Sequence, residues 1–460
     1  MHYRILPEAV VFLNPPYKYI IQRKLRCSPR RCAYLFPPSE LLSLASLMTD
    51  TQDIKLIFID GIAERLSLKE VVSALKGYRI RALIFMPGFE SLEEDLKTIS
   101  KIKENLNADC RIISFGYLPT LYYRDIFQKF PLIDYIIMGE PEATFMELSA
   151  AILAGNKDLS RIRGLAINDN GKITVNENRK NDMDLDSLPF PDRRLLRNDC
   201  YADPFLKKPM TSLITSRGCP YNCSFCVNFY GRVFRQRSAE NVIGELKQVV
   251  ADQHIRNIRF MDDNFTIDKN RIIKICKGII DNSLRLNWTC LSRIDTLDKE
   301  VLAWMSQAGC RAVFLGIESG SQKVLDYYNK GYTVDLIKRQ CRLIKKAGIA
   351  IVSWFIIGAP VETAMDVKAS LKLSLEINSD FICINELQLM PTTALFKVSR
   401  GPFRLSPAEI SRLRRKFYLG FYFNPKIIRK ILLRLAKKPE GLLFFIKEFF
   451  SAMREKYIEK

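Results

Sequence analysis

The sequence predicts an α/β protein in which a doubly wound, Rossmann-like domain precedes a partial (β/α)6 barrel of the TIM type, with a helical extension at the C-terminus. Three observations predict this architecture. Short apolar runs alternate with helix-length segments in residues 5–138 and again in residues 213–389. A polar stretch separates the two series. The length of 460 residues indicates two or three domains.

The first series defines the N-terminal domain, which we place at residues 1–185. Strands joined by helical crossovers pair in parallel, and ligands of such sheets bind at the carboxyl ends of the strands. Several strands end in loops that contain Pro or Gly, beginning with Asn14-Pro15-Pro16. The expected strands are 5–13, 54–59, 82–86, 111–115 and 135–138, and the expected helices are 39–48, 68–75 and 92–105.

A connector follows this domain. Residues 168–181 are polar and rich in Gly and Asn, which is typical of a small hairpin. Leu188-Pro189-Phe190-Pro191 is expected to be extended, because proline restricts itself and the residue before it. We therefore predict a linker at residues 186–204.

The second series defines the barrel, which we place at residues 205–400. It has six strand–helix units, fewer than the eight of a complete barrel. Residues 401–460 follow as a basic helical region in which Arg and Lys alternate with Phe, Tyr and Leu. The expected barrel strands are 213–215, 258–261, 287–290, 312–316, 351–357 and 381–389, and the helices are 238–253, 268–280, 299–308, 333–347 and 364–375.

Composition limits the class of protein. Hydrophobic residues make up 48% and charged residues 26%, a balance typical of soluble globular proteins. No apolar run approaches the roughly 18–20 residues that span a bilayer, and the N-terminus lacks the features of a signal peptide. We expect a cytoplasmic protein.

The net charge of +21 indicates an anionic partner, which could be nucleic acid, a membrane surface or a phosphate-rich cofactor. The basic C-terminal helices are expected first to cover the open edge of the barrel, with a solvated outer face. Peripheral contact with the inner membrane surface is the second interpretation, which would suit a lipid substrate. Nucleic acid is the least favoured partner, because no RNA-binding module is evident.

One group of cysteines is close enough in sequence to bind metal. Cys219, Cys223 and Cys226 follow directly after the first barrel strand. Each thiolate can bind one iron of a cubane cluster, so three ligands leave the fourth iron open. The alternatives are a zinc site and a chance grouping of cysteines, but structural zinc sites use a fourth Cys or His, and the chain has two histidines. We predict a [4Fe–4S] cluster.

The other cysteines receive simpler interpretations. Cys27 and Cys32 lie in a basic segment with no further ligands nearby, so we expect a reduced surface loop rather than a second metal site. Five more are expected to be small buried hydrophobic residues, namely Cys276, Cys290, Cys310, Cys341 and Cys383.

The three-cysteine motif, with the aromatic Phe225 before its last cysteine, resembles that of the radical S-adenosylmethionine (SAM) superfamily. The resemblance covers the barrel. It implies that the open iron chelates the amino and carboxylate groups of SAM, and that one electron converts the sulfonium into methionine and a 5′-deoxyadenosyl radical. It also implies an electron donor such as flavodoxin or ferredoxin.

Supporting positions follow at the ends of successive barrel strands. Carboxylates after the second strand could accept hydrogen bonds from the SAM ammonium group, and a guanidinium after the third could meet its carboxylate. Such residues are also common in helix caps and turns. The predicted SAM-binding residues are Phe225, Asp262, Asp263, Ser292, Arg293, Glu318, Ser319 and Gly358.

The N-terminal domain and its connector resemble the cobalamin-binding branch of the same superfamily. The sequence departs from that pattern twice. It has no Asp-x-His-x-x-Gly motif, so no histidine of this domain could bind cobalt from below, and Phe115-Gly116 replaces an expected Gly-Gly pair. The alternatives are a domain that has lost the cofactor or one that binds substrate. The residues that the resemblance assigns to cobalamin are Asn14, Pro15, Gly116, Thr120, Gly139 and Glu140.

Three functions are therefore compatible with the sequence. The leading one is a radical SAM enzyme, cobalamin-dependent, that methylates or remodels an unactivated carbon of a natural product, lipid or tetrapyrrole. The second is a cobalamin-free cyclase, oxidoreductase or sulfur-inserting enzyme. The third is a binding module with a structural cluster.

Overall fold

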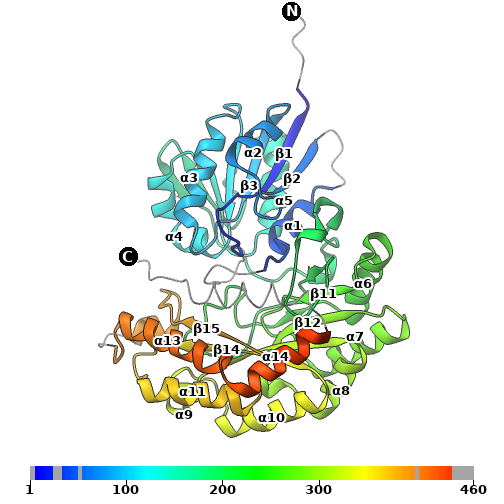
Figure 1. Cartoon of the computed structure of the whole chain (residues 1–460). Coiled ribbons are helices and arrows are strands. Elements are labelled where there is room, and N and C mark those ends of the chain that lie inside the picture. The colour runs from blue at the N-terminus through cyan, green and yellow to red at the C-terminus, as the bar shows by residue number, and fades with distance from the viewer. Residues whose placement is uncertain (1–5, 24–33, 50–53, 399–402, 438–460) are drawn as a thin grey trace, which may run out of the picture. The chain divides into compact units, whose positions relative to one another are not determined.

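The computed structural model describes residues 6–23, 34–49, 54–398 and 403–437 (Figure 1). The chain divides into two compact units. The first unit contains the chain up to Tyr201 together with Phe229–Gly231, and the second contains the remainder. The finer division into domain, linker, barrel and tail stays a prediction. Cys27 and Cys32 lie outside the described residues.

The first unit contains one seven-stranded sheet in the order β2-β1-β3-β4-β5-β6-β7. Its first five strands are parallel, and the hairpin of β6 and β7 adds an antiparallel edge. The strands are β1 (Glu8–Asn14), β2 (Lys55–Asp60), β3 (Arg79–Phe85), β4 (Arg111–Phe115), β5 (Tyr135–Ile137), β6 (Leu165–Asp169) and β7 (Lys172–Val175). The helices are α1 (Ser39–Ser46), α2 (Leu68–Leu75), α3 (Leu92–Lys103), α4 (Tyr117–Lys129) and α5 (Glu142–Leu153).

Both faces of this sheet are apolar. Val11 and Leu13 of β1 belong to a core shared with α2, α3 and α4, whereas Val10 and Phe12 belong to a second core shared with α1 and α5. A strand buried on both faces needs a nearly continuous apolar run, which is what β1 shows. Helices on both faces of a mostly parallel sheet define a doubly wound fold, so the predicted class is confirmed.

The second unit contains six parallel strands in the order β15-β14-β13-β12-β11-β8, which confirms the predicted partial barrel. The short pair β9 (Ser216–Arg217) and β10 (Arg235–Gln236) lies outside this sheet. The barrel strands are β8 (Thr211–Leu213), β11 (Asn257–Phe260), β12 (Asn287–Ser292), β13 (Cys310–Glu318), β14 (Ala350–Ile357) and β15 (Phe381–Glu386). The helices are α6 (Ala239–Gln253), α7 (Lys269–Asp281), α8 (Lys299–Gln307), α9 (Gln322–Tyr327), α10 (Val334–Lys346), α11 (Ala364–Glu376), α12 (Ala394–Val398), α13 (Pro407–Tyr422) and α14 (Pro425–Lys437).

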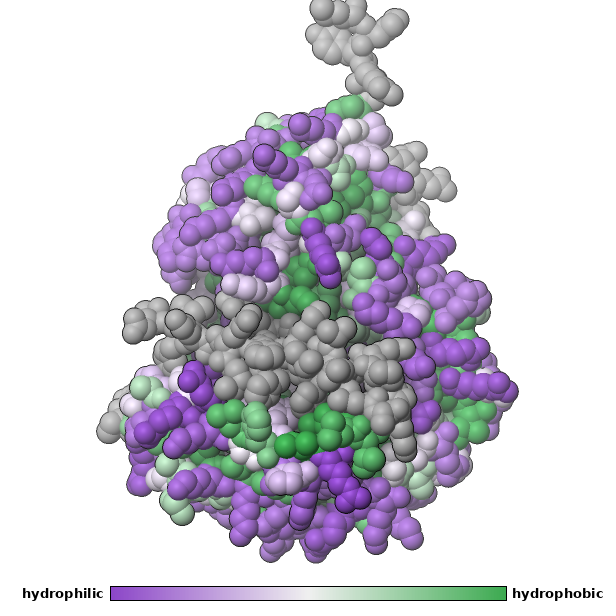
Figure 2. Space-filling view, in the orientation of Figure 1, coloured by the Kyte–Doolittle hydropathy of each residue, from purple (hydrophilic) through white to green (hydrophobic). Residues whose placement is uncertain are grey.

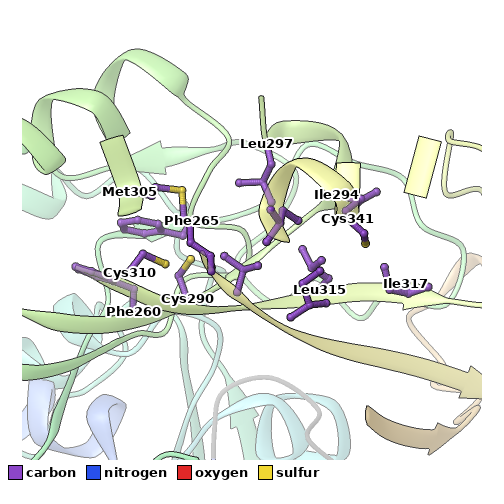
Figure 3. Close-up of a cluster of buried hydrophobic side chains, with 14 of the residues drawn as sticks. Phe260, Phe265, Cys290, Ile294, Leu297, Met305, Cys310, Leu315, Ile317 and Cys341 are labelled. Carbon is purple, nitrogen blue, oxygen red and sulfur yellow. The ribbon is translucent and has the colours of Figure 1, made fainter. Parts of the chain in front are cut away.

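The core of the second unit lies between the strands and the surrounding helices (Figure 3). Phe260 and Phe265 stack with ring centroids 4.3 Å apart, and Cys290 and Cys310 point into the same apolar layer. Cys276 and Cys341 are buried as well, as predicted. The fifth cysteine of that prediction, Cys383, is only partly buried.

The C-terminal helices close this unit. Buried aromatic residues of α13, such as Phe417 and Phe421, join the main core, and Arg414 forms an ion pair with Glu386 of β15 at 3.3 Å. No helix in the described part of the chain is long and apolar enough to cross a bilayer.

Candidate functional site

The cysteine loop is held by backbone hydrogen bonds to segments far away in the sequence. The amide of Ser224 donates to the carbonyl of Tyr328 at 3.0 Å, and its carbonyl accepts from the amide of Leu395 at 2.8 Å. Two side chains add to this frame, because Asn329 Nδ2 donates to the Asn222 carbonyl and Asn228 Nδ2 to the Cys219 carbonyl. These bonds hold the backbone of the loop without using its cysteine side chains.

The three thiols of this loop are free and at least partly buried. Burial raises the pKa of Cys226 to about 11, and the Asn228 amide opposes that effect. Burial also raises the pKa of Cys219, against the Tyr221 amide. Bound metal would favour the thiolate forms instead.

A buried guanidinium lies beside the loop. Arg293, directly after β12, donates from Nη1 to Cys223 Sγ at 3.4 Å, and its Nε and Nη2 bind the two oxygens of Asp295 at 2.9 Å each. Burial lowers the pKa of Arg293, but Asp295, with smaller contributions from Cys223 and Tyr332, raises it more, so the net pKa is raised. The side chain is therefore charged.

A second buried cation, Lys330, lies beside Arg293, whose Nη2 donates to the Lys330 carbonyl. Its ammonium group is 3.0 Å from the carboxylate of Glu318, and both side chains are buried. Burial lowers the pKa of Lys330, but Glu318 and the nearby Tyr332 and Cys223 together raise it more, so the net pKa is raised. Glu318 has a positive φ of 64°, and a Cβ on Gly316 would lie 2.3 Å from its Oε1. Glycine at position 316 thus makes room for this carboxylate.

Other predicted strand-end residues have protein partners. Both oxygens of Asp262 accept hydrogen bonds from Thr215 and Ser216, which tie the end of β8 to β11. Ser292 bonds to Thr266 and to the Arg293 carbonyl, and Ser319 pairs with Ser370 of α11. Asp263 is near enough to Cys219 and Cys226 to raise the pKa of both thiols, after the larger effects of burial.

The turn after β14 is held by a buried carboxylate. Glu362 accepts from the Gly358 amide at 2.6 Å through Oε2. Its Oε1 and the hydroxyl of Tyr328 are buried and lack hydrogen-bond partners within the described residues. Phe225 packs against the Tyr328 ring, with centroids 5.0 Å apart. This aromatic and apolar wall adjoins the cysteine loop.

At the carboxyl edge of the first unit, Asn14 is committed to a buried network. It donates to Asp60 at 2.7 Å and accepts from Arg23 at 2.6 Å, and Arg23 also donates to the Pro15 carbonyl. Arg23 forms a further ion pair with Asp95 at 2.5 Å. These contacts fix the loop after β1.

The other residues that the resemblance assigns to cobalamin lie after β4 and β5, at the carboxyl edge of the same sheet. Gly116 precedes α4, and the Gly139 amide donates to Thr120 Oγ1 at 3.1 Å. Gly139 has a φ of 73°, and a Cβ built on it meets nothing within 4 Å. Glu140 beside it is buried. Ser114 Oγ, near the end of β4, is buried without a hydrogen-bond partner among the described residues.

Two comparisons with known proteins identify the family. The model of the radical SAM superfamily matches residues 213–374, from β8 into α11. The uncharacterized methyltransferase PH0819 of Pyrococcus horikoshii is 32% identical over 416 residues, which cover 86% of this chain and 89% of that protein. This chain belongs to the radical SAM superfamily.

Other similar proteins extend this result. The anaerobic magnesium-protoporphyrin IX monomethyl ester cyclase of Rubrivivax gelatinosus is 27% identical over 380 residues, which cover 81% of this chain and 66% of that protein. A solved structure of the radical SAM methyltransferase TsrM from Kitasatospora setae, with cobalamin and a [4Fe–4S] cluster bound, has a TM-score of 0.66 and 19% identity over 85% of this chain and 74% of that chain. The structural likeness confirms the predicted fold.

As a member of the radical SAM superfamily, the chain is an enzyme whose family cofactors are an iron–sulfur cluster and SAM. The donor set of the loop suits such a cluster, since three thiols come from one short segment. No three His, Cys, Asp or Glu side chains of the described chain converge on a single metal ion. A cubane does not require that convergence, because each thiolate binds a different iron.

Sequence reasoning missed Lys330. This residue lies in the turn between α9 and α10, where no apolar periodicity or strand end marks it. At this position the sequence shows a lysine followed by Gly331, a pair that is also common in solvated turns. Its burial depends on Glu318, twelve positions earlier in the chain.

Proposed function

We propose that this radical SAM enzyme holds a [4Fe–4S] cluster on Cys219, Cys223 and Cys226, and that it uses SAM and cobalamin to methylate or remodel an unactivated carbon of a small molecule or lipid. The three-thiol loop beside the barrel strands carries the proposal. Methyltransferases among the relatives, PH0819 in particular, support the reaction class.

The residues around the loop have separate roles in this proposal. Lys330 and Glu318 present opposite charges that could pair with the carboxylate and ammonium groups of SAM. Asn264 has a buried Nδ2 with no partner among the described residues, so it offers one further donor. Phe225 and Tyr328 provide an apolar wall that excludes water. When bound, the cluster would supply one electron to the sulfonium of SAM.

The first unit provides features that suit a large cofactor. Gly139 leaves open space beside its backbone, and the buried Ser114 hydroxyl supplies an unused polar atom near the neighbouring strand end. His254 belongs to the second unit, and His2 lies outside the described residues. We therefore propose cobalamin binding without a histidine below the cobalt, with Asn14 shaping the loop after β1 rather than offering a free amide.

The cluster assignment is tested by anaerobic reconstitution followed by Mössbauer spectroscopy. Wild-type protein should hold four irons per chain, and Cys223→Ala should lose the cluster and all SAM cleavage. Cys276→Ala is a matched control, because it removes a buried thiol outside the loop and should retain the cluster. A wild-type protein without a four-iron centre would refute the proposal.

Product analysis separates the candidate reactions. With reductant from flavodoxin or ferredoxin, a methylated product and S-adenosylhomocysteine support the methyltransferase. 5′-Deoxyadenosine without methylation would instead support the cyclase or another cobalamin-free reaction, which the cyclase relatives make the second candidate. A reducible cluster that cleaves no SAM would indicate a structural role.

We also propose that α14 contacts an anionic membrane surface. Ile428, Leu432 and Leu433 are exposed on this helix, and Arg429 and Lys426 lie exposed among them. Figure 2 shows hydrophobic side chains gathered over α14. Lys430 anchors the helix to Asp380 at 2.9 Å. Apolar residues flanked by cations suit the interface of an anionic bilayer.

Vesicle flotation tests this contact. The wild type should float with phosphatidylglycerol vesicles and much less with phosphatidylcholine vesicles. The double variant Leu432→Glu/Leu433→Glu should lose most of that binding. Met365→Glu, at an exposed apolar residue of α11, should not. Equal flotation of the wild type and the double variant would contradict the proposal.

A further inference from the structure

The orientation of Arg293 is unusually well determined by its neighbours. Asp295 binds one edge of the guanidinium through two hydrogen bonds, and Nη2 also donates to the Lys330 carbonyl at 2.7 Å. The guanidinium carbon lies 3.6 Å from the centre of the Tyr221 ring and 5.1 Å from that of Tyr332. The plane of the guanidinium is thus fixed by contacts on its edge and on its faces.

The fixed plane directs one N–H at a sulfur atom. Nη1 donates to Cys223 Sγ at 3.4 Å, although the two residues are 70 positions apart in sequence. Four of the five N–H groups of Arg293 are used in these contacts. One N–H on Nη1 remains, so Arg293 cannot also bind a SAM carboxylate with two hydrogen bonds unless it gives up one of its contacts with Asp295, Cys223 or the Lys330 carbonyl.

We propose that Arg293 is a positioning residue of the cluster, and that its N–H on Cys223 makes the cluster easier to reduce. This inference rests on the proposed function, because it takes Cys223 as a cluster ligand. Reduction places more negative charge on the ligand sulfurs, so a fixed donor stabilises the reduced state more than the oxidised state. Burial strengthens the effect.

The direction of the N–H matters more here than net charge. Asp295 compensates the charge of Arg293, and Glu318 compensates that of Lys330. The two cation–carboxylate pairs are therefore close to neutral. A lysine at position 293 would keep the charge but lack the planar fork that holds one N–H on the sulfur.

The test is a redox titration of the full chain after anaerobic reconstitution, followed by electron paramagnetic resonance. At the midpoint potential of the wild type, Arg293→Gln should lower the ratio of reduced to oxidised cluster about tenfold, which corresponds to 59 mV for one electron. Arg293→Lys should lower it by a smaller factor. Arg311→Gln is the matched control, since it removes an exposed arginine at the other end of β13 and should leave the ratio unchanged.

Iron content decides how each result is interpreted. If Arg293→Gln keeps four irons and titrates like the wild type, the inference is overturned. If Arg293→Gln loses iron, the Arg293→Lys titration decides, with a lowered ratio in support and an unchanged ratio against. Absence of the cluster from the wild type would instead refute the proposed function.

Discussion

At the scale of single residues, the chemistry of the barrel site depends on ionisable groups that are buried. Glu362 illustrates this. Burial raises its pKa to about 7, and the amides of Gly358 and Ala359 only partly oppose that effect. A carboxyl group with a raised pKa holds its proton in the folded state over a range in which the unfolded chain has released it.

This pKa predicts an unusual pH dependence of stability. Between pH 4.5 and 7 the folded state binds more protons than the unfolded state, so the contribution of Glu362 to the free energy of unfolding decreases as pH rises. The total change is about 3 kcal/mol at most. Urea denaturation across this range should show that decrease in the wild type and lose it in Glu362→Gln. A Gln variant with the wild-type pH profile would disprove the assignment.

The sequence allowed part of this site to be predicted at the residue scale. Spacing and strand ends mark the three cysteines and Arg293 as candidates, and the structure brings Arg293 to Cys223, while their roles stay predictions. The partners of Asp262 were not recognisable, because both of its oxygens are used by Thr215 and Ser216 of another strand end. Sequence patterns show which residues lie at the carboxyl edge of a sheet, but not which neighbouring groups form hydrogen bonds with them there.

At the scale of elements, most helices and strands could be predicted from apolar periodicity. Helix α2 and strand β4 have the predicted bounds, and other elements differ by a few residues at their ends. Helices α4 and α5 are not among the predicted helices, because Pro119 and the apolar stretch of α5 hide a helical pattern. Strand β13 extends past its predicted end to Glu318, through an irregularity after Gly316.

The close approach of Glu318 to Gly316 predicts the effect of adding a single methyl group at position 316. In Gly316→Ala the new Cβ would lie 2.3 Å from Glu318 Oε1 and 3.5 Å from Lys330 Nζ, so the buried ion pair must shift. We expect a loss of about 1–3 kcal/mol in the free energy of unfolding and weaker SAM binding. Gly77→Ala, where a Cβ meets nothing within 4 Å, should change stability by less than about 0.5 kcal/mol. Equilibrium denaturation of both variants checks this difference.

At the scale of the whole molecule, two folds built on parallel sheets share one chain. The doubly wound class and the six-stranded barrel were predictable because both depend on parallel strands and crossovers, which leave a repeated pattern. The positions of the two units relative to each other leave no such pattern in the sequence. The identity of the substrate is equally hidden, because it depends on side chains gathered from many elements.

Hydroxocobalamin should stabilise the whole protein if the first unit binds it. A ligand at a concentration 100 times its Kd adds about 2.7 kcal/mol to the free energy of unfolding, which would appear as a higher Tm. Gly139→Leu should abolish the increase by filling the open space at the strand ends. Gly155→Leu replaces another glycine of positive φ with open surroundings, after α5, and should keep it. No corrin absorbance after gel filtration of the wild type would refute cobalamin binding.

The backbone bonds of Ser224 to Tyr328 and Leu395 have a consequence for the life of the enzyme in air. Oxygen destroys exposed iron–sulfur centres, and a segment shaped only by its metal would collapse each time. Here the hydrogen bonds of Ser224 to Tyr328 and Leu395 do not involve the cluster, so we expect the loop to keep its shape when the cluster is lost. Damaged protein should accept fresh iron and sulfide without passing through an unfolded state.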